Sequence, residues 1–79
     1  MTGRTTLAVL ASGPEEFRRW CYDSGLSPRD PEVVYVDRAE RLRGMTDVKF
    51  IRCHRAWEHP RVTEIEEVVR LIEQRRTHP

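Results

Sequence analysis

Three short apolar runs, each followed by residues that commonly start a helix, constrain the fold of this chain more than any other feature. The runs are Thr6–Ala11, Val33–Val36 and Val48–Cys53. The helix-start candidates that follow them are Ser12 or Gly13, then Asp37, then Thr63. A strand–helix pattern repeated three times predicts a small α/β protein with the order β-α-β-α-β-α, a three-stranded parallel sheet and helices packed on it. With 79 residues and no internal linker, we expect residues 1–79 to form a single domain.

The character of each strand predicts the order of the sheet. The first strand, expected over Thr5–Ala11, is almost continuously apolar, which suits a strand buried on both faces. The second is expected over Glu32–Val36, and the third, over Val48–Cys53, contains charged residues typical of an edge. We therefore favour strand order 2-1-3, with 3-2-1 as the alternative. Open sheet edges can pair with another chain, so a homodimer through a sheet edge is also expected as a partner arrangement.

Local signals place the helices. The first should start near Pro14, bury a face made of Phe17, Trp20, Cys21 and Ser24, and end in a Schellman turn at Gly25. The second should be short, Arg38–Arg43, with Asp37 and Glu40 as a capping box and Gly44 as its end. The third should run over Pro60–Arg76, with Thr63 and Glu66 as its capping box. Its apolar stripe is Val62, Ile65, Val68, Val69 and Ile72, with Leu71 at the margin.

Composition excludes some classes of protein. No apolar stretch approaches the roughly 20 residues that cross a bilayer, and Met1–Arg4 leads into a strand without the apolar segment of a secretory signal. Two cysteines do not make a disulfide framework. We therefore expect a cytoplasmic protein with no membrane partner.

Positive charge is concentrated in the middle of the chain. Residues 38–61 hold six arginines, one lysine and three acidic residues, a net charge of +4, whereas residues 1–37 carry −2 and residues 62–79 carry −1. A basic segment can attract nucleic acid or another acidic partner. The simpler interpretation is a set of solvated surface arginines.

The residues at the predicted helix starts argue against a conventional nucleotide site. Such a site needs free backbone N–H groups and positive potential, and this chain places Pro14, Glu15 and Glu16, then Asp37, then Glu64 at those positions. The sequence also has no GxGxxG or GxxxxGK[ST] motif. We expect no cofactor.

Metal binding and catalysis are equally unsupported by spacing. The sequence has no CxxC or HxxxH pair, and Cys53 and His54, adjacent on a strand, are expected on opposite faces. No acidic partner is placed to complete a Cys–His catalytic set. We therefore expect no metal site, no catalytic residue and no enzymatic activity.

The segment Arg52–Arg61 is the most distinctive in the chain because it combines arginine, histidine and tryptophan beside a sheet edge. Trp and Arg are enriched among the residues that dominate protein interfaces, and the same pair suits single-stranded nucleic acid. The candidate partner-binding residues are Arg52, Arg55, Trp57 and Arg61. The alternative is that Trp57 packs down as a lid over the small core.

Several phrases of the sequence resemble small accessory proteins of actinobacteriophages. They are Val9-Leu10-Ala11, Glu15-Glu16-Phe17, Trp20-Cys21, Gly25-Leu26-Ser27-Pro28-Arg29-Asp30, Val34-Tyr35-Val36 and Leu42-Arg43-Gly44, and the last helix with Pro60 ahead of it is also similar. Thirteen arginines against one lysine fit a GC-rich genome. The resemblance implies a phage accessory protein in the host cytoplasm and supplies no catalytic residues.

Three functions follow as hypotheses. The leading one is a non-enzymatic interaction module that acts on a host protein. The alternative is nucleic-acid binding through segment 38–61, and the third is a degenerate enzyme or small-ligand domain at the carboxyl ends of the strands.

Overall fold

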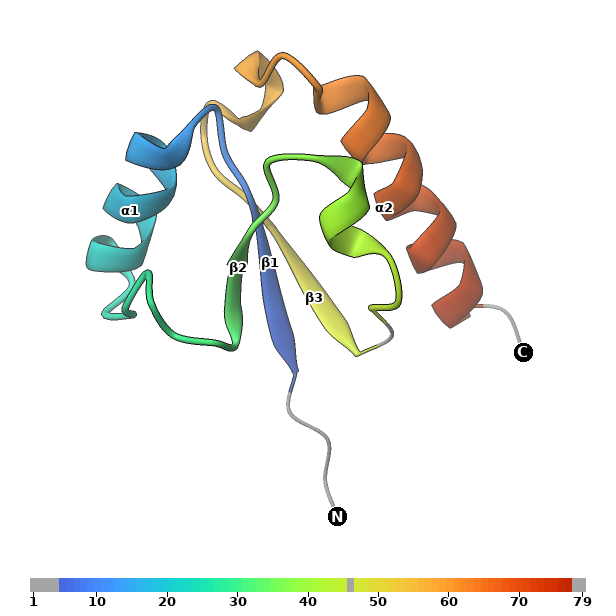
Figure 1. Cartoon of the computed structure of the whole chain (residues 1–79), viewed down its shortest axis with the longest axis horizontal. Helices are drawn as coiled ribbons and strands as arrows, with labels where there is room; N and C mark the ends of the chain where they lie inside the picture. Colours follow the sequence, from blue (N-terminus) through green and yellow to red (C-terminus); the bar gives the residue numbers. More distant parts are fainter. Residues whose placement is uncertain (1–4, 46, 78–79) are drawn as a thin grey trace.

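The architecture is a three-stranded parallel sheet with helices on both faces (Figure 1). The computed structural model describes residues 5–45 and 47–77. The strands are β1 (Thr6–Leu10), β2 (Val33–Tyr35) and β3 (Val48–Arg52), and their order in the sheet is β2-β1-β3. The predicted class, the parallel sheet and the order 2-1-3 are confirmed, and the alternative order 3-2-1 is wrong.

β1 is central because its side chains are apolar on both faces. It pairs with β2 from Leu7 opposite Val33, and with β3 along its full length, from Thr6 opposite Val48. Ala8 and Val9 are completely buried. The continuous apolar run of the sequence therefore marks the strand that is covered on both sides.

Alternate residues of β1 point into two separate hydrophobic cores, one on each face of the sheet. One core lies between the sheet and α1 (Pro14–Asp23), and its buried residues are Val9, Ala11, Phe17, Cys21 and Val33. The other lies on the opposite face, against α2 (Val62–Thr77). Its buried residues are Ala8, Leu10, Val36, Leu42, Val48, Ala56, Ile65, Val69 and Ile72. The described residues thus form three layers with the sheet in the middle.

The ends of α1 follow local sequence signals closely. Pro14 is the first residue of the helix. Gly13 occupies the N-cap position and, having no side chain, offers no oxygen to cap the helix. At the other end, Gly25 takes a φ of +73° and its N–H donates to the Tyr22 carbonyl at 3.1 Å, while the Leu26 N–H donates to the Cys21 carbonyl at 2.8 Å. These two bonds are the predicted Schellman turn.

The second helix differs from its prediction. In place of an α-helix over 38–43, the structure has a single 3₁₀ turn, η1 (Ala39–Leu42), preceded by Arg38 and with no side-chain cap. The Asp37 carboxylate pairs with Arg38 and Arg41 at 3.6 and 3.2 Å, so it does not cap. One turn is sufficient here because it already buries Leu42 in the core, after which Gly44, at φ +79°, reverses the chain.

The start of α2 also differs. The helix begins at Val62, so Thr63 lies inside it and is not the cap. His59, two residues before Arg61, instead holds the helix start in place: its Nδ1 accepts the Arg61 N–H at 3.0 Å and its carbonyl accepts the Val62 N–H at 3.1 Å. A 3₁₀ turn, η2 (Ala56–Glu58), precedes it within the segment expected to be a loop.

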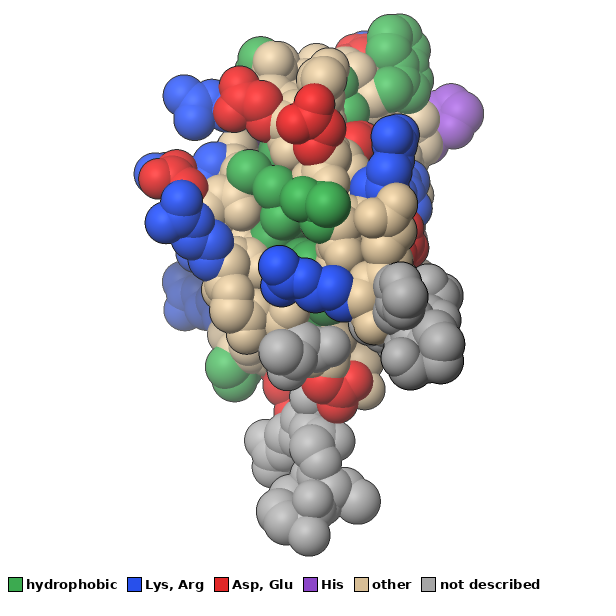
Figure 2. Space-filling view, turned by 90° about the vertical axis from the view of Figure 1, so that its right-hand side faces the viewer, with side chains coloured by type: hydrophobic (Ala, Val, Ile, Leu, Met, Phe, Trp, Pro, Cys, Tyr) green, Lys and Arg blue, Asp and Glu red, His purple; other side chains and the backbone are tan. Residues whose placement is uncertain are grey.

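On the outer side of α2, Leu71 lies at the edge of the helix's apolar stripe, as expected. Hydrophobic side chains are visible there among Lys, Arg, Asp and Glu (Figure 2), and Leu71 is 56% exposed, whereas Ile65 and Val69 are buried. Among the described residues, no helix combines the length and the apolar character needed to cross a membrane. Met1–Arg4, to which the prediction about a secretory signal applies, lie outside the described residues.

Candidate functional site

The carboxyl ends of β1 and β3 define the place to look for a site. These strands are neighbours, and the chain leaves β1 toward α1 on one face of the sheet and β3 toward α2 on the other (Figure 1). In open α/β sheets, ligands commonly bind in the crevice outside the strands where successive connections diverge in this way. Residues 12–16 follow β1, and residues 53–61 follow β3, at this edge of the sheet.

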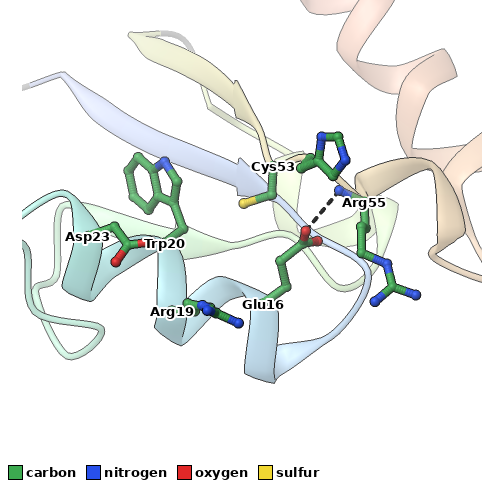
Figure 3. Close-up of a pocket in the computed structure, with 7 residues that line it drawn as sticks. Glu16, Arg19, Trp20, Asp23, Cys53 and Arg55 are labelled. Atoms are coloured by element: carbon green, nitrogen blue, oxygen red, sulfur yellow. Dashed lines mark hydrogen bonds between the residues drawn. The ribbon is translucent and has the colours of Figure 1, made fainter.

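Glu16 links the two sides of the crevice. Its Oε1 accepts the Ser12 N–H and its Oε2 accepts the Arg55 N–H, each at 2.8 Å, and the second bond is drawn in Figure 3. Burial opposes ionisation of this carboxyl group, but the backbone bonds from Ser12 and Arg55 outweigh it and hold its pKa below the ordinary value of 4.5. The protein's own carboxylate therefore occupies the two amides that an anionic ligand would need at this point.

A pocket of about 380 Å³ opens beside Glu16, between α1 and the segment after β3 (Figure 3). It is lined by Glu16, Arg19, Trp20, Asp23, Cys53, His54 and Arg55. Cys53 and His54 both line it, and neither lies on the strand, which was the premise for expecting them on opposite faces. β3 ends at Arg52, and residues beyond a strand end no longer alternate between the two faces of the sheet.

The chemistry available to Cys53 is restricted by its surroundings. Burial, together with the nearby Glu16 and Cys21, raises the pKa of the Cys53 thiol to about 11. The thiolate is the nucleophilic form, so at neutral pH nearly all of this sulfur is unreactive thiol. Within the described residues, no group of three His, Cys, Asp or Glu side chains is close enough to hold a metal ion.

Two of the four predicted contact residues are engaged by carboxylates. Arg52, on β3, makes a two-pronged ion pair with Glu66 of α2, with bonds of 2.8 and 2.7 Å. Arg55 makes an equivalent pair with Glu58 of η2, also at 2.8 and 2.7 Å. The side chain of Arg52 therefore points toward α2, and that of Arg55 lies against η2.

Trp57 is presented to solvent. Its side chain is 71% exposed, so the alternative in which it covers the core is wrong. The residues around it are fixed: Ala56 and His59 are buried, and the His59 N–H donates to the Ala56 carbonyl at 3.1 Å. Arg61, at the end of the same segment, is exposed.

The basic segment 38–61 is partly neutralised in the folded protein. Among the described residues, Arg38 and Arg41 pair with Asp37, Arg52 pairs with Glu66, and Arg55 pairs with Glu58. Two of these acids, Asp37 and Glu66, lie outside the segment in sequence. The charge excess read from the sequence therefore does not carry over as an equal excess of free cations on the surface.

Sequence reasoning missed two organising residues. Glu16 has a visible local signal, an acid three residues after the helix-start residue Gly13, but its bond to Arg55 joins positions 39 residues apart. The buried ring of His59 accepts a backbone N–H and lies edge-on to Tyr35, with ring centroids 6.4 Å apart.

Comparison of the chain with protein-family models, curated proteins and solved structures gives no match.

Proposed function

We propose that this protein is a non-enzymatic interaction module that binds another protein through the η2 segment, with Trp57 at the centre of the contact. The resemblance to actinobacteriophage accessory proteins makes the partner a protein of the host cytoplasm. The observation that carries the proposal is a 71% exposed tryptophan held on a turn with fixed flanks.

Exposure of Trp57 leaves a large aromatic surface available for a partner. Burial of a large apolar side chain contributes roughly 1.5–3 kcal/mol. Tryptophan is also the residue type most enriched among the few that dominate interface energies. A partner that covers Trp57 therefore gains more than it would from any aliphatic side chain in the same position.

The backbone around Trp57 is already ordered. The Arg55 N–H is held by Glu16, the Glu58 N–H donates to the Arg55 carbonyl at 3.0 Å, and the side chain of His59 is buried. Less conformational entropy is lost on binding when the contact residues are ordered beforehand. The Arg55–Glu58 pair and Arg61 supply the polar rim usual around an apolar centre.

The test uses Trp57→Ala in the full chain. The wild-type protein is used to capture its partner from a nuclease-treated actinobacterial lysate, and the affinity of the purified partner is then measured by calorimetry. We expect Trp57→Ala to weaken binding by about 30-fold or more, as truncation of a central interface tryptophan does. Leu71→Ala is the control, because Leu71 is an exposed large hydrophobic residue on α2, away from the η2 segment. Equal binding by folded Trp57→Ala and wild type would refute the assignment.

Arg55→Ala addresses the rim in the same assay. This substitution removes the Arg55–Glu58 ion pair as well as any contact of Arg55 with the partner. Because rim residues contribute less to affinity than central ones, we expect a smaller loss of affinity than for Trp57→Ala. Arg52→Ala and Arg61→Ala complete the set of predicted contacts. An Arg52→Ala effect larger than that of Trp57→Ala would move the centre of the interface toward α2.

Nucleic-acid binding through segment 38–61 is the alternative proposal. It predicts affinity that falls steeply between about 50 and 200 mM salt, because counterions are released when arginines contact phosphates. The ion pairs of Arg38, Arg41, Arg52 and Arg55 reduce the number of free cations and favour the protein partner. Affinity for the captured partner that survives both nuclease and salt supports the interaction module.

Self-association through a sheet edge is a further proposal about partners. Among the described strands, the outer edges of β2 and β3 have no neighbour. β2 is only three residues long and β3 exposes Lys49 and Arg52, features that commonly protect an edge from pairing. Sedimentation equilibrium over a range of concentrations distinguishes a monomer from an edge-paired dimer.

A further inference from the structure

A second recess lies away from the strand ends, between α1 and the edge strand β2. It has a volume of about 680 Å³, larger than the pocket beside Glu16. We call it the α1–β2 groove: Arg18 and Tyr22 come from α1, Arg29 from the following loop, and Tyr35 from β2. Its size falls within the range of ordinary small-molecule sites, roughly 300–1,000 Å³.

Aromatic rings dominate the apolar part of the groove. Phe17 and Tyr35 stack with their centroids 5.3 Å apart and their planes at 23°, which makes a fixed base. Tyr22 stands beside them on α1 and is 79% exposed, more than any other large hydrophobic side chain described. An exposed, sterically free ring next to a recess is well suited to stack on a planar group of a ligand.

The charged part of the groove is entirely positive. Arg18 and Arg29 line it, and no Asp or Glu does. Neither guanidinium group forms an ion pair or a side-chain hydrogen bond with the described residues, in contrast to the paired arginines of segment 38–61. Arg18 lies one helical turn before Tyr22, so the cation and the ring project side by side from α1.

We propose that the α1–β2 groove binds a nucleotide unit, with the base stacked on Tyr22 and the phosphate held by Arg18 and Arg29. Guanidinium groups form paired, charge-assisted hydrogen bonds with phosphate, and aromatic side chains stack on bases without regard to sequence. The unit comes either as a free mononucleotide or as part of a single strand. This site is independent of the contact through Trp57 and of the helix starts at the strand ends.

The experiment titrates the full-length protein with two probes, adenosine monophosphate and a fluorescein-labelled oligothymidylate of roughly ten nucleotides. Calorimetry follows the first and fluorescence anisotropy the second. We expect Tyr22→Ala and Arg18→Ala each to weaken binding about ten-fold. The matched control is Arg19→Ala, which removes the same charge from the adjacent position, outside the groove. It should leave the affinity unchanged.

The outcomes separate the two sources and the two functional proposals. Equal affinity for both probes identifies a mononucleotide, and much tighter, salt-dependent binding of the oligonucleotide identifies a single strand. Either result supports the site, provided that Arg18→Ala and Tyr22→Ala weaken the binding of the probe and Trp57→Ala does not. Failure of both probes to bind, loss of binding only in Trp57→Ala, or an equal loss in Arg19→Ala and Arg18→Ala would overturn the proposal.

Discussion

Glu16 is the single side chain on which the geometry of the strand ends depends most. We expect Glu16→Gln to lower the free energy of unfolding by about 1 kcal/mol and Glu16→Ala by about 2 kcal/mol, because the amides of Ser12 and Arg55 lose charged acceptors. Partial solvent exposure keeps the effect below that of a fully buried group. Glu15→Gln, one position earlier on the same turn, is the control and should change stability little. Urea denaturation at pH 7 measures all three.

The stabilisation by Glu16 should also depend on pH. The folded pKa of this carboxyl group lies below its ordinary value of 4.5, so the charged form favours folding. The contribution is fully present above pH 4.5 and is lost as the pH falls through the lower, folded value. Wild type and Glu16→Gln should therefore differ most near neutral pH and converge in acid. A stability difference that persists unchanged below pH 3 would contradict the role of the ionised carboxylate.

Cys53 should react slowly despite lining an open pocket. With a pKa of about 11, its thiolate population at pH 8 is far below that of an ordinary cysteine. We expect iodoacetamide to alkylate Cys53 at least ten-fold more slowly than a free thiol at pH 8, and faster as the pH approaches 11. Mass spectrometry of the native protein measures this rate. Unfolding in urea, which should expose Cys53 and the buried Cys21 together, is the control.

At the level of elements, the Schellman turn after α1 offers a clean test of backbone conformation. Gly25 has a φ of +73°, which a Cβ atom disfavours, although space around it is open. Gly25→Ala should destabilise the protein by about 1 kcal/mol. Gly25→Asn should recover part of that loss, because asparagine tolerates left-handed conformations better. Thermal melts followed by circular dichroism compare the three proteins, and an alanine variant as stable as wild type would count against this account of the turn.

Elements set by adjacent residues were readable from the sequence, and those set by distant partners were not. The apolar run around Val9 identified the central strand, and Gly25 identified the end of α1. The capping boxes at Asp37 and Thr63 were wrong, because Asp37 pairs with two arginines and His59 satisfies the start of α2. A local motif predicts which bonds are available, while the tertiary structure selects among them.

The candidate site shows the same division. Trp57 and Arg55 were identified by residue type, but the exposure of one and the ion pair of the other depend on contacts formed only in the fold. The α1–β2 groove was missed because its arginines, Arg18 and Arg29, lie in the part of the chain with a net negative charge. Net charge along a sequence does not report which charges are paired in space.

For the molecule as a whole, the two cores share the sheet between them, so each face depends on the other. Ile65, buried in the α2 core, tests this dependence: we expect Ile65→Ala to cost about 3 kcal/mol, a large share of the stability of so small a domain. Leu71→Ala, on the same helix but 56% exposed, should cost well under 1 kcal/mol. Chemical denaturation followed by tryptophan fluorescence in a Trp57→Phe background, which leaves Trp20 against the opposite core, should report the same midpoint as circular dichroism. Separate midpoints would show that the two faces unfold independently.

The bond from the Arg55 amide to Glu16 also bears on how the chain assembles. It joins α1 to the segment beyond β3, two parts of the chain that come together when β1 and β3 pair, so it depends on a contact between residues 39 apart in the sequence. The local turns at Gly25 and Gly44 carry no such requirement, and they can form early. In a pulse-labelling hydrogen-exchange experiment, the Arg55 amide should gain protection no earlier than the amides of β3, and so report the moment at which the native topology closes.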